Sequence, residues 1–175
     1  MDLNYSTTNL FPSVIHQFDV NGFDEIRDKL IDYAYDLKKR EPEGVSISNH
    51  GGWQSPDFSV NNEDDVLHYF IINCLAGFPV INESFNIKVD AWININKTGN
   101  YNIKHNHPGV DLAGVLWIKC PKDCGVIVFD SPTGFQSHNE INSYNDNFKN
   151  QNNLFHSYQF DPTEGKILIF PAHLN

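Results

Sequence analysis

Between Phe85 and Asn96 every second residue is apolar and the residues between are mostly polar, and this alternation constrains the fold more than any other feature of the sequence. The apolar positions are Phe85, Ile87, Val89, Ala91, Ile93 and Ile95, and the positions between them are Asn86, Lys88, Asp90, Trp92, Asn94 and Asn96. A period of two is that of a β-strand, whose successive side chains point to opposite faces. The segment predicts a long strand with one apolar face and one mostly polar face.

Further strand-like runs follow this segment to the end of the chain. They are Tyr101 to His107, Ala113 to Lys119, Gly125 to Asp130, His156 to Phe160 and Lys166 to Phe170. Each is short and rich in β-branched or aromatic residues, as expected of strands. The second half of the chain is therefore expected to be built mainly from strands.

The first half of the chain has the period of a helix instead. From Phe23 to Leu37, apolar residues recur at steps of three and four, which places them on one face of a helix. Asn21 is the expected N-cap, and Pro42 and Gly44 are expected to stop the helix. A second stripe of apolar residues predicts another helix from about Glu63 to Ala76.

Helices first and strands later indicate an α+β fold with the helices packed against one sheet. The length of 175 residues suits a single domain, with a helical part over residues 1–80 and a strand part over residues 81–175. Two segments are expected to be irregular. The glycines in Ser48–Ser55 indicate a tight turn, and the polar, Asn-rich segment Ser131–Leu154 is expected to be a surface loop, either a functional lid or a mobile insertion.

Charge and composition exclude several classes of protein. The formal net charge of -10 repels phosphate backbones, so nucleic acid is not an expected partner. No apolar run approaches the length of a membrane span. No N-terminal stretch has a basic region followed by an apolar run, so a signal peptide is not expected. The odd number of cysteines, Cys74, Cys120 and Cys124, indicates reduced thiols and a cytoplasmic location. The spacing of Cys120 and Cys124 is one residue wider than that of a zinc knuckle, and no second pair exists.

The most informative local feature is the pair His105 and His107. In an extended strand, residues two apart point to the same face, so the two imidazoles can reach one ion. Imidazole suits iron, zinc, copper or nickel. Pro108 cannot continue an interior strand, which places the pair at a strand end beside a loop. Asp111 follows four residues after His107 and supplies a carboxylate nearby.

Several motifs follow one another in a fixed order over most of the chain. They are Trp92 with Asn94, Gly99, His105-Asn106-His107-Pro108, Gly114-Val115, Gly125 with Phe129, and Glu164-Gly165 through Phe170-Pro171, preceded by Leu10-Phe11-Pro12, Ser48-Asn49 and Gly51-Gly52-Trp53-Gln54-Ser55. This order resembles the family of putative 2-oxoglutarate/Fe(II)-dependent oxygenases and, more distantly, the prolyl hydroxylases. The resemblance implies a double-stranded β-helix, a jelly-roll or cupin-like barrel, with N-terminal helices packed on one sheet.

The resemblance also implies a site. Such enzymes hold Fe(II) with a His-x-Asp or His-x-Glu pair and a distal histidine. His105 takes the first histidine position, and His107 stands where the family more often has a carboxylate. The second ligand is therefore His107 or, if the loop folds back, Asp111. Asn94, on the polar face of its strand, and Tyr101 are expected to line the pocket of the 2-oxoglutarate cosubstrate. The alternative for Asn94 is a buried hydrogen-bonding role.

By the spacing of the family, the distal histidine and the arginine that binds 2-oxoglutarate fall after Asn175, and Arg27 and Arg40 cannot replace that arginine by position. The chain is therefore expected to be either a truncated version of a longer protein, which is the favoured interpretation, or a degenerate member of the family. The implied function is an Fe(II)- and 2-oxoglutarate-dependent dioxygenase that uses O2 to hydroxylate a peptide side chain or a small metabolite. The alternatives are a catalytically incomplete binding module and a cupin-like metal protein. Neither the substrate nor the oligomeric state follows from the sequence.

Overall fold

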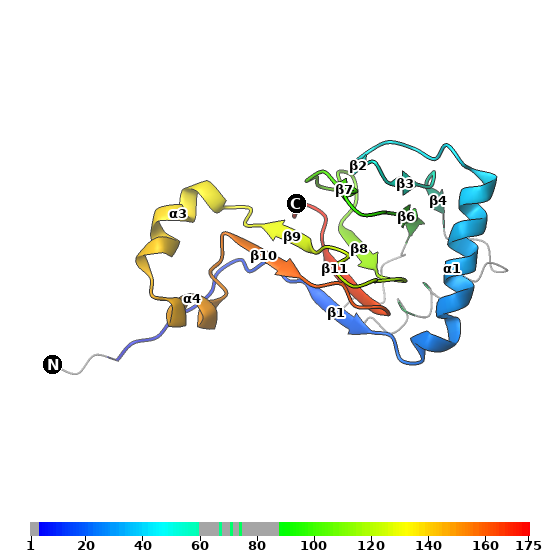
Figure 1. The fold of residues 1–175 in the computed structure, drawn as a ribbon. Coiled ribbons are helices and arrows are strands. Elements are labelled where there is room, and N and C mark those ends of the chain that lie inside the picture. The colour runs from blue at the N-terminus through cyan, green and yellow to red at the C-terminus, as the bar shows by residue number, and fades with distance from the viewer. Residues whose placement is uncertain (1–3, 60–66, 68–70, 72–73, 75–87) are drawn as a thin grey trace.

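A computed structural model describes residues 4–59, 67, 71, 74 and 88–175 of the chain (Figure 1). The elements in order are β1 (His16–Asp19), α1 (Phe23–Arg40), β2 (Asn49–His50), β3 (Trp53–Gln54), β4 (Phe58–Ser59), β5 (Asp90–Ala91), β6 (Asn94–Ile95), β7 (Tyr101–Asn102), β8 (Leu112–Leu116), β9 (Ile127–Asp130), α3 (Gly134–Ser143), α4 (Asp146–Asn152), β10 (Ser157–Phe160) and β11 (Lys166–Pro171). The strand pairings of this part of the chain are antiparallel.

The first predicted helix is confirmed as α1. Its buried residues Phe23, Leu30 and Ala34 follow the predicted stripe. The predicted N-cap is wrong by one residue, because Gly22 holds that position with a left-handed φ of 71°. The second predicted helix, Glu63 to Ala76, lies outside the described residues except for Leu67, Ile71 and Cys74, which are helical and belong to the core beside α1.

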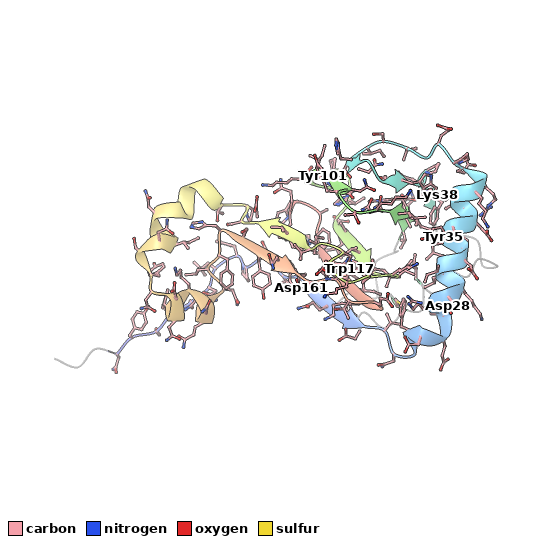
Figure 2. All side chains as sticks on the ribbon, in the orientation of Figure 1. Asp28, Tyr35, Lys38, Tyr101, Trp117 and Asp161 are labelled. Atoms are coloured by element: carbon pink, nitrogen blue, oxygen red, sulfur yellow. The ribbon has the colours of Figure 1, made fainter. Side chains whose placement is uncertain are left out.

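Helix α1 covers one end of the strand-rich body (Figure 1). Its apolar stripe packs with Trp53 of β3 and with Ile93, which lies between β5 and β6. Cations add to the contact at its edges: Lys38 Nζ lies 5.7 Å from the centre of the Trp53 ring, and Lys119 Nζ lies 5.9 Å from that of Tyr35 (Figure 2). The packing of an N-terminal helix against strands is therefore as the sequence predicts.

A second core surrounds β11, the middle strand of the sheet β1-β11-β8. Leu168 at the centre of β11 has an exposed fraction of 0%. Phe129, Phe170 and Leu174 complete the buried cluster. Strand β1 pairs antiparallel with β11, and His16 lies opposite Ile169. The sequence analysis did not predict this strand.

The long strand predicted from the alternating segment is interrupted. Strands β5 and β6 pair with β4 and β3, and the register shifts by one residue between the two ladders. Ser55 lies at this shift: its N–H donates to the Ile93 carbonyl, and its hydroxyl accepts the Ile93 N–H at 2.9 Å. Such an extra residue is a β-bulge, which a residue pattern does not reveal. The predicted alternation of exposed and buried side chains from Lys88 to Asn96 is nevertheless confirmed.

The described strands do not close into a barrel. They form one three-stranded sheet and four two-stranded sheets, so the predicted double-stranded β-helix is not confirmed in this part of the chain, although its antiparallel pairing is. Short strands are the cause. Strands β2 to β7 have two residues each, and the bulge at Ser55 and the turn at Pro108 and Gly109 break the ladders.

The prediction of a loop over Ser131–Leu154 is wrong. The segment folds into the helices α3 and α4, which project from the strand-rich body beyond β9 and β10 (Figure 1). Local capping stabilises α4, because the Asn145 side chain accepts the Phe148 N–H at 2.9 Å. Asn153 closes the helix in the left-handed conformation, with a φ of 53°. Two of the asparagines, Asn145 and Asn153, thus cap α4, and the others in the segment lie within the two helices.

Candidate functional site

His105 and His107 lie in an irregular segment between β7 and β8, and not in the predicted strand from Tyr101 to His107. Only Tyr101 and Asn102 of that strand are paired, and the chain bends at Lys104. Backbone contacts then fix the segment. The Ile103 N–H donates to the Ser48 carbonyl at 2.7 Å, and the His107 N–H donates to the Ala172 carbonyl at 2.9 Å.

The end of β11 therefore forms the support of the histidine segment. Beyond Pro171, the Ala172 carbonyl receives the His107 N–H, and the Ala172 N–H donates to the Asp111 carbonyl at 3.1 Å. Both bonds join residues far apart in the sequence. They hold the loop from His107 to Asp111 at both ends, across the turn at Pro108 and Gly109.

The two imidazole rings lie together as the sequence predicts. Their centroids are 4.9 Å apart, and the ring planes meet at 68°. His107 is half-buried between Trp92, at 5.8 Å, and Phe170, at 6.3 Å, whereas His105 is exposed. One ring thus faces solvent, and the other is placed against two aromatic side chains of the body.

The hydrogen bonding of His105 fixes which nitrogen is free. Its Nδ1 lies 2.6 Å from the Ile103 carbonyl oxygen. A carbonyl only accepts, so Nδ1 carries the hydrogen, and the lone pair of the neutral ring is on Nε2. Metal-binding histidines are oriented in this way, with one ring N–H donated to a carbonyl or carboxylate. His105 is therefore prepared to offer Nε2 to an electrophile.

The surroundings of His107 favour its neutral form. Burial is the main cause that lowers the pKa of His107, and the neighbouring His105 adds to it. A neutral imidazole keeps a lone pair, which a metal ligand needs. The pair thus provides two nitrogen donors of the type that suits a divalent transition metal.

The predicted carboxylate Asp111 is exposed, and its backbone carbonyl is engaged by Ala172. Within the part of the chain that the structure describes, no three His, Cys, Asp or Glu side chains form a group that could hold a metal ion. His105 and His107 are thus brought together, and Asp111 does not complete a three-ligand group with them. The two imidazoles are suitable ligands for a divalent transition metal, but they form only part of a ligand set.

Asn94 and Tyr101, the residues predicted to line the cosubstrate pocket, lie in different surroundings. Asn94 in β6 is exposed on the same strand face as Trp92, which contacts His107. Tyr101 in β7 has an exposed fraction of 54% and stacks on His50 at 4.8 Å (Figure 2). Asn94 is therefore placed on the His107 side of the body, and Tyr101 is part of an exposed aromatic pair.

Gln54 is a residue of this face that the sequence analysis did not single out. Its exposed fraction is 3%, and its Oε1 has no hydrogen-bond partner among the described residues. In the β3–β6 ladder Gln54 is the partner of Asn94, so their side chains share a face. A buried carbonyl oxygen without a donor is costly, and a bound ligand with an N–H or O–H group would satisfy it.

The sequence signal for Gln54 was the Gly51-Gly52-Trp53-Gln54 motif, interpreted above as a turn without regular structure. The turn is present, but short strands flank it: β2 before the glycines and β3 after them. Asn49 holds the turn, since its Nδ2 donates to the Gly52 carbonyl at 3.0 Å. The prediction was therefore right about the turn and wrong about its neighbours.

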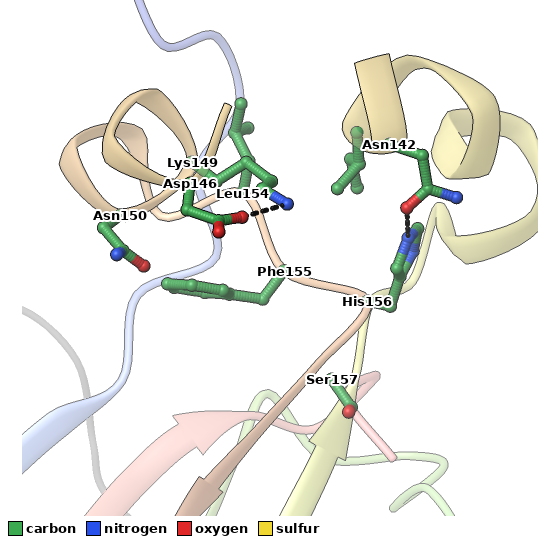
Figure 3. Close-up of a pocket in the computed structure, with 9 residues that line it drawn as sticks. Asn142, Asp146, Lys149, Asn150, Leu154, Phe155, His156 and Ser157 are labelled. Carbon is green, nitrogen blue, oxygen red and sulfur yellow. Dashed lines mark hydrogen bonds and ion pairs between the residues drawn. The ribbon is translucent and has the colours of Figure 1, made fainter. Parts of the chain in front are cut away.

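A concave site of about 400 Å³ lies elsewhere, in the helical segment between β9 and β10 (Figure 3). Its polar contacts are an ion pair of Lys149 with Asp146 at 2.7 Å and a contact of His156 with Asn142 at 3.3 Å. The remaining lining residues are Ile141, Asn150, Leu154, Phe155 and Ser157. This concavity does not include the histidine pair, so it is not the site that the sequence predicts.

Comparison with family models finds a match over the strand-rich second part of the chain. Residues 90–175 match the family model described as "Putative 2OG-Fe(II) oxygenase". The matched segment runs from β5 to the last residue and includes His105 and His107. A search of curated proteins finds no match. Among the described residues, no helix is long and apolar enough to cross a membrane.

Proposed function

Because residues 90–175 of this chain belong to the putative 2OG-Fe(II) oxygenase family, an oxidoreductase family, we propose that the protein is an Fe(II)- and 2-oxoglutarate-dependent dioxygenase. Its reaction would be the O2-dependent hydroxylation of a peptide side chain or a small metabolite. A bound ferrous ion would supply the redox chemistry that couples decarboxylation of 2-oxoglutarate to succinate and CO2 with oxidation of a substrate C–H bond.

The geometry of the histidine pair is the observation that carries the proposal. The rings are 4.9 Å apart, and the Ile103 carbonyl leaves the Nε2 lone pair of His105 free. In the proposed role, His105 and His107 hold the iron. The contacts of Ile103 and Ala172 with this segment keep the two donors oriented.

Neighbouring side chains would support the two donors. Trp92 and Phe170 exclude water from one side of His107 and so keep its ring neutral. Asn94 and Gln54 share the adjacent strand face and are proposed to bind polar groups of the cosubstrate or substrate, with the Oε1 of Gln54 accepting a hydrogen bond. Tyr101 is proposed as a further contact at the exposed edge of this region.

We propose His107, and not Asp111, as the second protein ligand. The ring of His107 already lies beside that of His105, whereas Asp111 forms no three-ligand group with the pair. Asp111→Asn should therefore leave metal affinity unchanged. A loss of affinity in this variant as large as that in His107→Ala would assign the ligand position to Asp111 instead.

A second candidate function is that of a metal-binding module without turnover. The observation that favours it is the incomplete ligand set among the described residues. A facial iron site is formed by two histidines and a carboxylate, and a site with fewer protein ligands holds its metal less firmly. Such a protein would bind a metal ion, with or without a metabolite, and catalyse no oxidation.

Succinate formation distinguishes the two functions. The purified chain is incubated in air with Fe(II), ascorbate and 2-oxoglutarate, and succinate is quantified by mass spectrometry. A dioxygenase forms succinate above the protein-free background even without substrate, by uncoupled decarboxylation, and His107→Ala should abolish the increase. His156→Ala, in the helical segment, serves as the control and should retain it. Iron bound together with 2-oxoglutarate but no succinate would favour the binding module.

A further inference from the structure

Lys104 connects the histidine segment to a distant strand. It lies between Ile103 and His105, and its Nζ is 2.6 Å from Oδ2 of Asp130, the last residue of β9. About half of each side chain is exposed, with exposed fractions of 54% for Lys104 and 44% for Asp130. The ion pair is thus a surface contact between residues that are 26 positions apart in the sequence.

Asp130 is a fixed anchor for this contact. It is paired in the β9–β10 ladder, and its N–H donates to the Asn175 carbonyl at 2.8 Å. The next residue, Ser131, donates its N–H to the His156 carbonyl at 2.8 Å. Because these backbone contacts hold Asp130 on both sides, Lys104 is the partner whose position depends on the ion pair.

The peptide unit between Ile103 and Lys104 carries the acceptor for His105. A peptide unit is planar, so the Ile103 carbonyl turns together with the Lys104 nitrogen. That carbonyl oxygen lies 2.6 Å from Nδ1 of His105, and the Ile103 N–H donates to the Ser48 carbonyl at 2.7 Å. One end of the peptide unit is therefore fixed through the backbone of Ile103, and the Lys104 side chain fixes the other.

We propose that Lys104 is a positioning residue for His105, held by its ion pair with Asp130. The pair keeps the Ile103 carbonyl directed at Nδ1 of His105, so that Nδ1 carries the hydrogen and Nε2 keeps its lone pair. The inference deepens the proposed function and rests on it, since the lone pair is needed where His105 binds a metal. Lys104 itself is not a ligand, because an ammonium group has no lone pair.

The expected effect of the ion pair is local and moderate. A neutral histidine carries its hydrogen on either ring nitrogen, and the hydrogen bonds of the ring select the form. Exposed ion pairs contribute little to global stability, and the upper end of their contribution corresponds to a factor of about five in an equilibrium constant. Loss of the pair should therefore lower the ratio of the Nδ1–H form of His105 to the Nε2–H form by up to about fivefold and leave urea unfolding almost unchanged.

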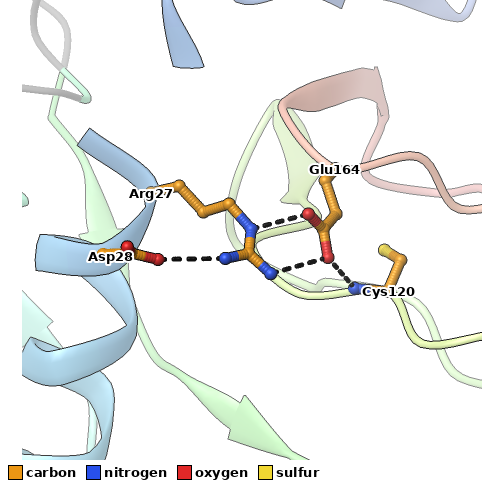
Figure 4. A network of polar contacts seen from close by, with 4 residues as sticks. All are labelled: Arg27, Asp28, Cys120 and Glu164. Carbon is orange, nitrogen blue, oxygen red and sulfur yellow. Dashed lines mark hydrogen bonds and ion pairs between the residues drawn. The ribbon is translucent and has the colours of Figure 1, made fainter. Parts of the chain in front are cut away.

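A second ion pair provides the matched control. Glu164, in the turn before β11, holds Arg27 of α1 with Nε at 2.6 Å and Nη2 at 3.2 Å, and it accepts the Cys120 N–H at 2.8 Å (Figure 4). Ala172, which supports the histidine segment, follows the other end of β11, about 20 Å away for a strand of six residues. Glu164→Gln should therefore lower the stability of the fold without moving the hydrogen on His105.

The first test uses the metal-free, folded chain labelled with ¹⁵N. Long-range proton–nitrogen correlation NMR, at a pH where the ring is neutral, shows which nitrogen of His105 carries the hydrogen, and in the wild type this should be mainly Nδ1. Lys104→Met and Asp130→Asn should each shift the ratio toward the Nε2–H form. Lys104→Arg, which keeps the charge, and Glu164→Gln should retain the ratio of the wild type. An unchanged ratio in both Lys104→Met and Asp130→Asn, or an equal shift in Glu164→Gln, would overturn the proposal.

Anaerobic calorimetric titration with Fe(II) connects the positioning to the proposed function. Lys104→Met and Asp130→Asn should each weaken binding by up to about fivefold, and the double variant should bind no more weakly than either single variant, because both changes break one contact. Fe(II) binding that needs His105 but is unaffected in both single variants would overturn the positioning and leave the proposed function intact. If the wild type binds no Fe(II) while the NMR ratios shift as expected, the proposed function fails and the positioning of the ring stands.

Discussion

Replacing Gly165 with alanine should destabilise the fold mainly through one clash with Phe23. Gly165 has a φ of +77°, and a Cβ added there would lie 2.7 Å from the Cγ of Phe23. Phe23 opens α1 and has an exposed fraction of 6%, so its ring has little room to move. The left-handed backbone costs alanine about 1–2 kcal/mol, and overpacking adds about 1–3 kcal/mol. We expect a total loss of roughly 2–5 kcal/mol in the free energy of unfolding.

Gly99→Ala separates the two contributions. Gly99 has a φ of +83°, but a Cβ there meets nothing within 4 Å. This variant should therefore lose only the backbone contribution of about 1–2 kcal/mol. Both alanines restrict the unfolded chain alike, by about 0.4–1 kcal/mol, and this effect cancels in the difference.

Urea unfolding monitored by tryptophan fluorescence gives the free energies of both variants. Gly165→Ala should be about 1–3 kcal/mol less stable than Gly99→Ala. In a Phe23→Ala background the difference between the two glycine variants should shrink, because the ring is absent, but it should not vanish, because the Cβ of residue 23 stays 2.8 Å from the added Cβ. Equal stability of the two variants in the wild-type background would refute the clash. It would also refute the close packing of Phe23, at the start of α1, against the turn at Gly165 that precedes β11.

Three further changes test the fold around the site. Leu168→Ala removes a side chain with an exposed fraction of 0% and should cost about 2–5 kcal/mol in urea unfolding, whereas exposed Leu112→Ala should cost far less. The pKa of Glu164 is lowered by Arg27 and then by the Cys120 N–H, so the folded state binds fewer protons than the unfolded chain, and stability should fall as the pH drops through the acidic range. Glu164→Gln should show a shallower fall of the urea midpoint over that range. Asn145→Ala removes the cap of α4 and should cost about 0.5–2 kcal/mol of helix stability, seen as faster amide exchange in α4 but not in α1.

Periodicity predicted much of the fold because it reports burial. The stripe in Phe23–Leu37 gave α1, and the alternation up to Asn96 gave the exposed and buried sides of β5 and β6. It could not give the bulge at Ser55, since an extra residue on the partner strand leaves no trace in the pattern of Lys88–Asn96. Barrel closure also depends on pairings between distant segments, which a local pattern does not contain.

The helices α3 and α4 were missed for a different reason. Asparagine has a low helix propensity, so a segment with many asparagines reads as a loop. In the structure, Asn145 and Asn153 lie at the two ends of α4, where a side-chain acceptor or a left-handed residue is favoured. The position of an asparagine relative to a helix end, and not the number of asparagines, would have given the helix.

For the site, the sequence predicted that two histidines lie close together, but it did not predict the residues that support them. His105 and His107 lie together as expected, although on an irregular segment and not on a strand. Their orientation depends on the carbonyls of Ile103 and Ala172, and Ala172 is far from the pair in the sequence. Gln54 belongs to the Gly51–Ser55 motif, but the motif predicted only a turn and not the burial of this glutamine.

The central claim is that His105 and His107 bind one ferrous ion, and anaerobic calorimetric titration with Fe(II) tests it most directly. His105→Ala and His107→Ala should each weaken binding by roughly tenfold or more, since removal even of a residue that only orients a ligand costs this much. His156→Ala, whose ring lies in the helical segment, should bind as the wild type does. Fe(II) affinity equal to that of the wild type in both His105→Ala and His107→Ala would contradict the account.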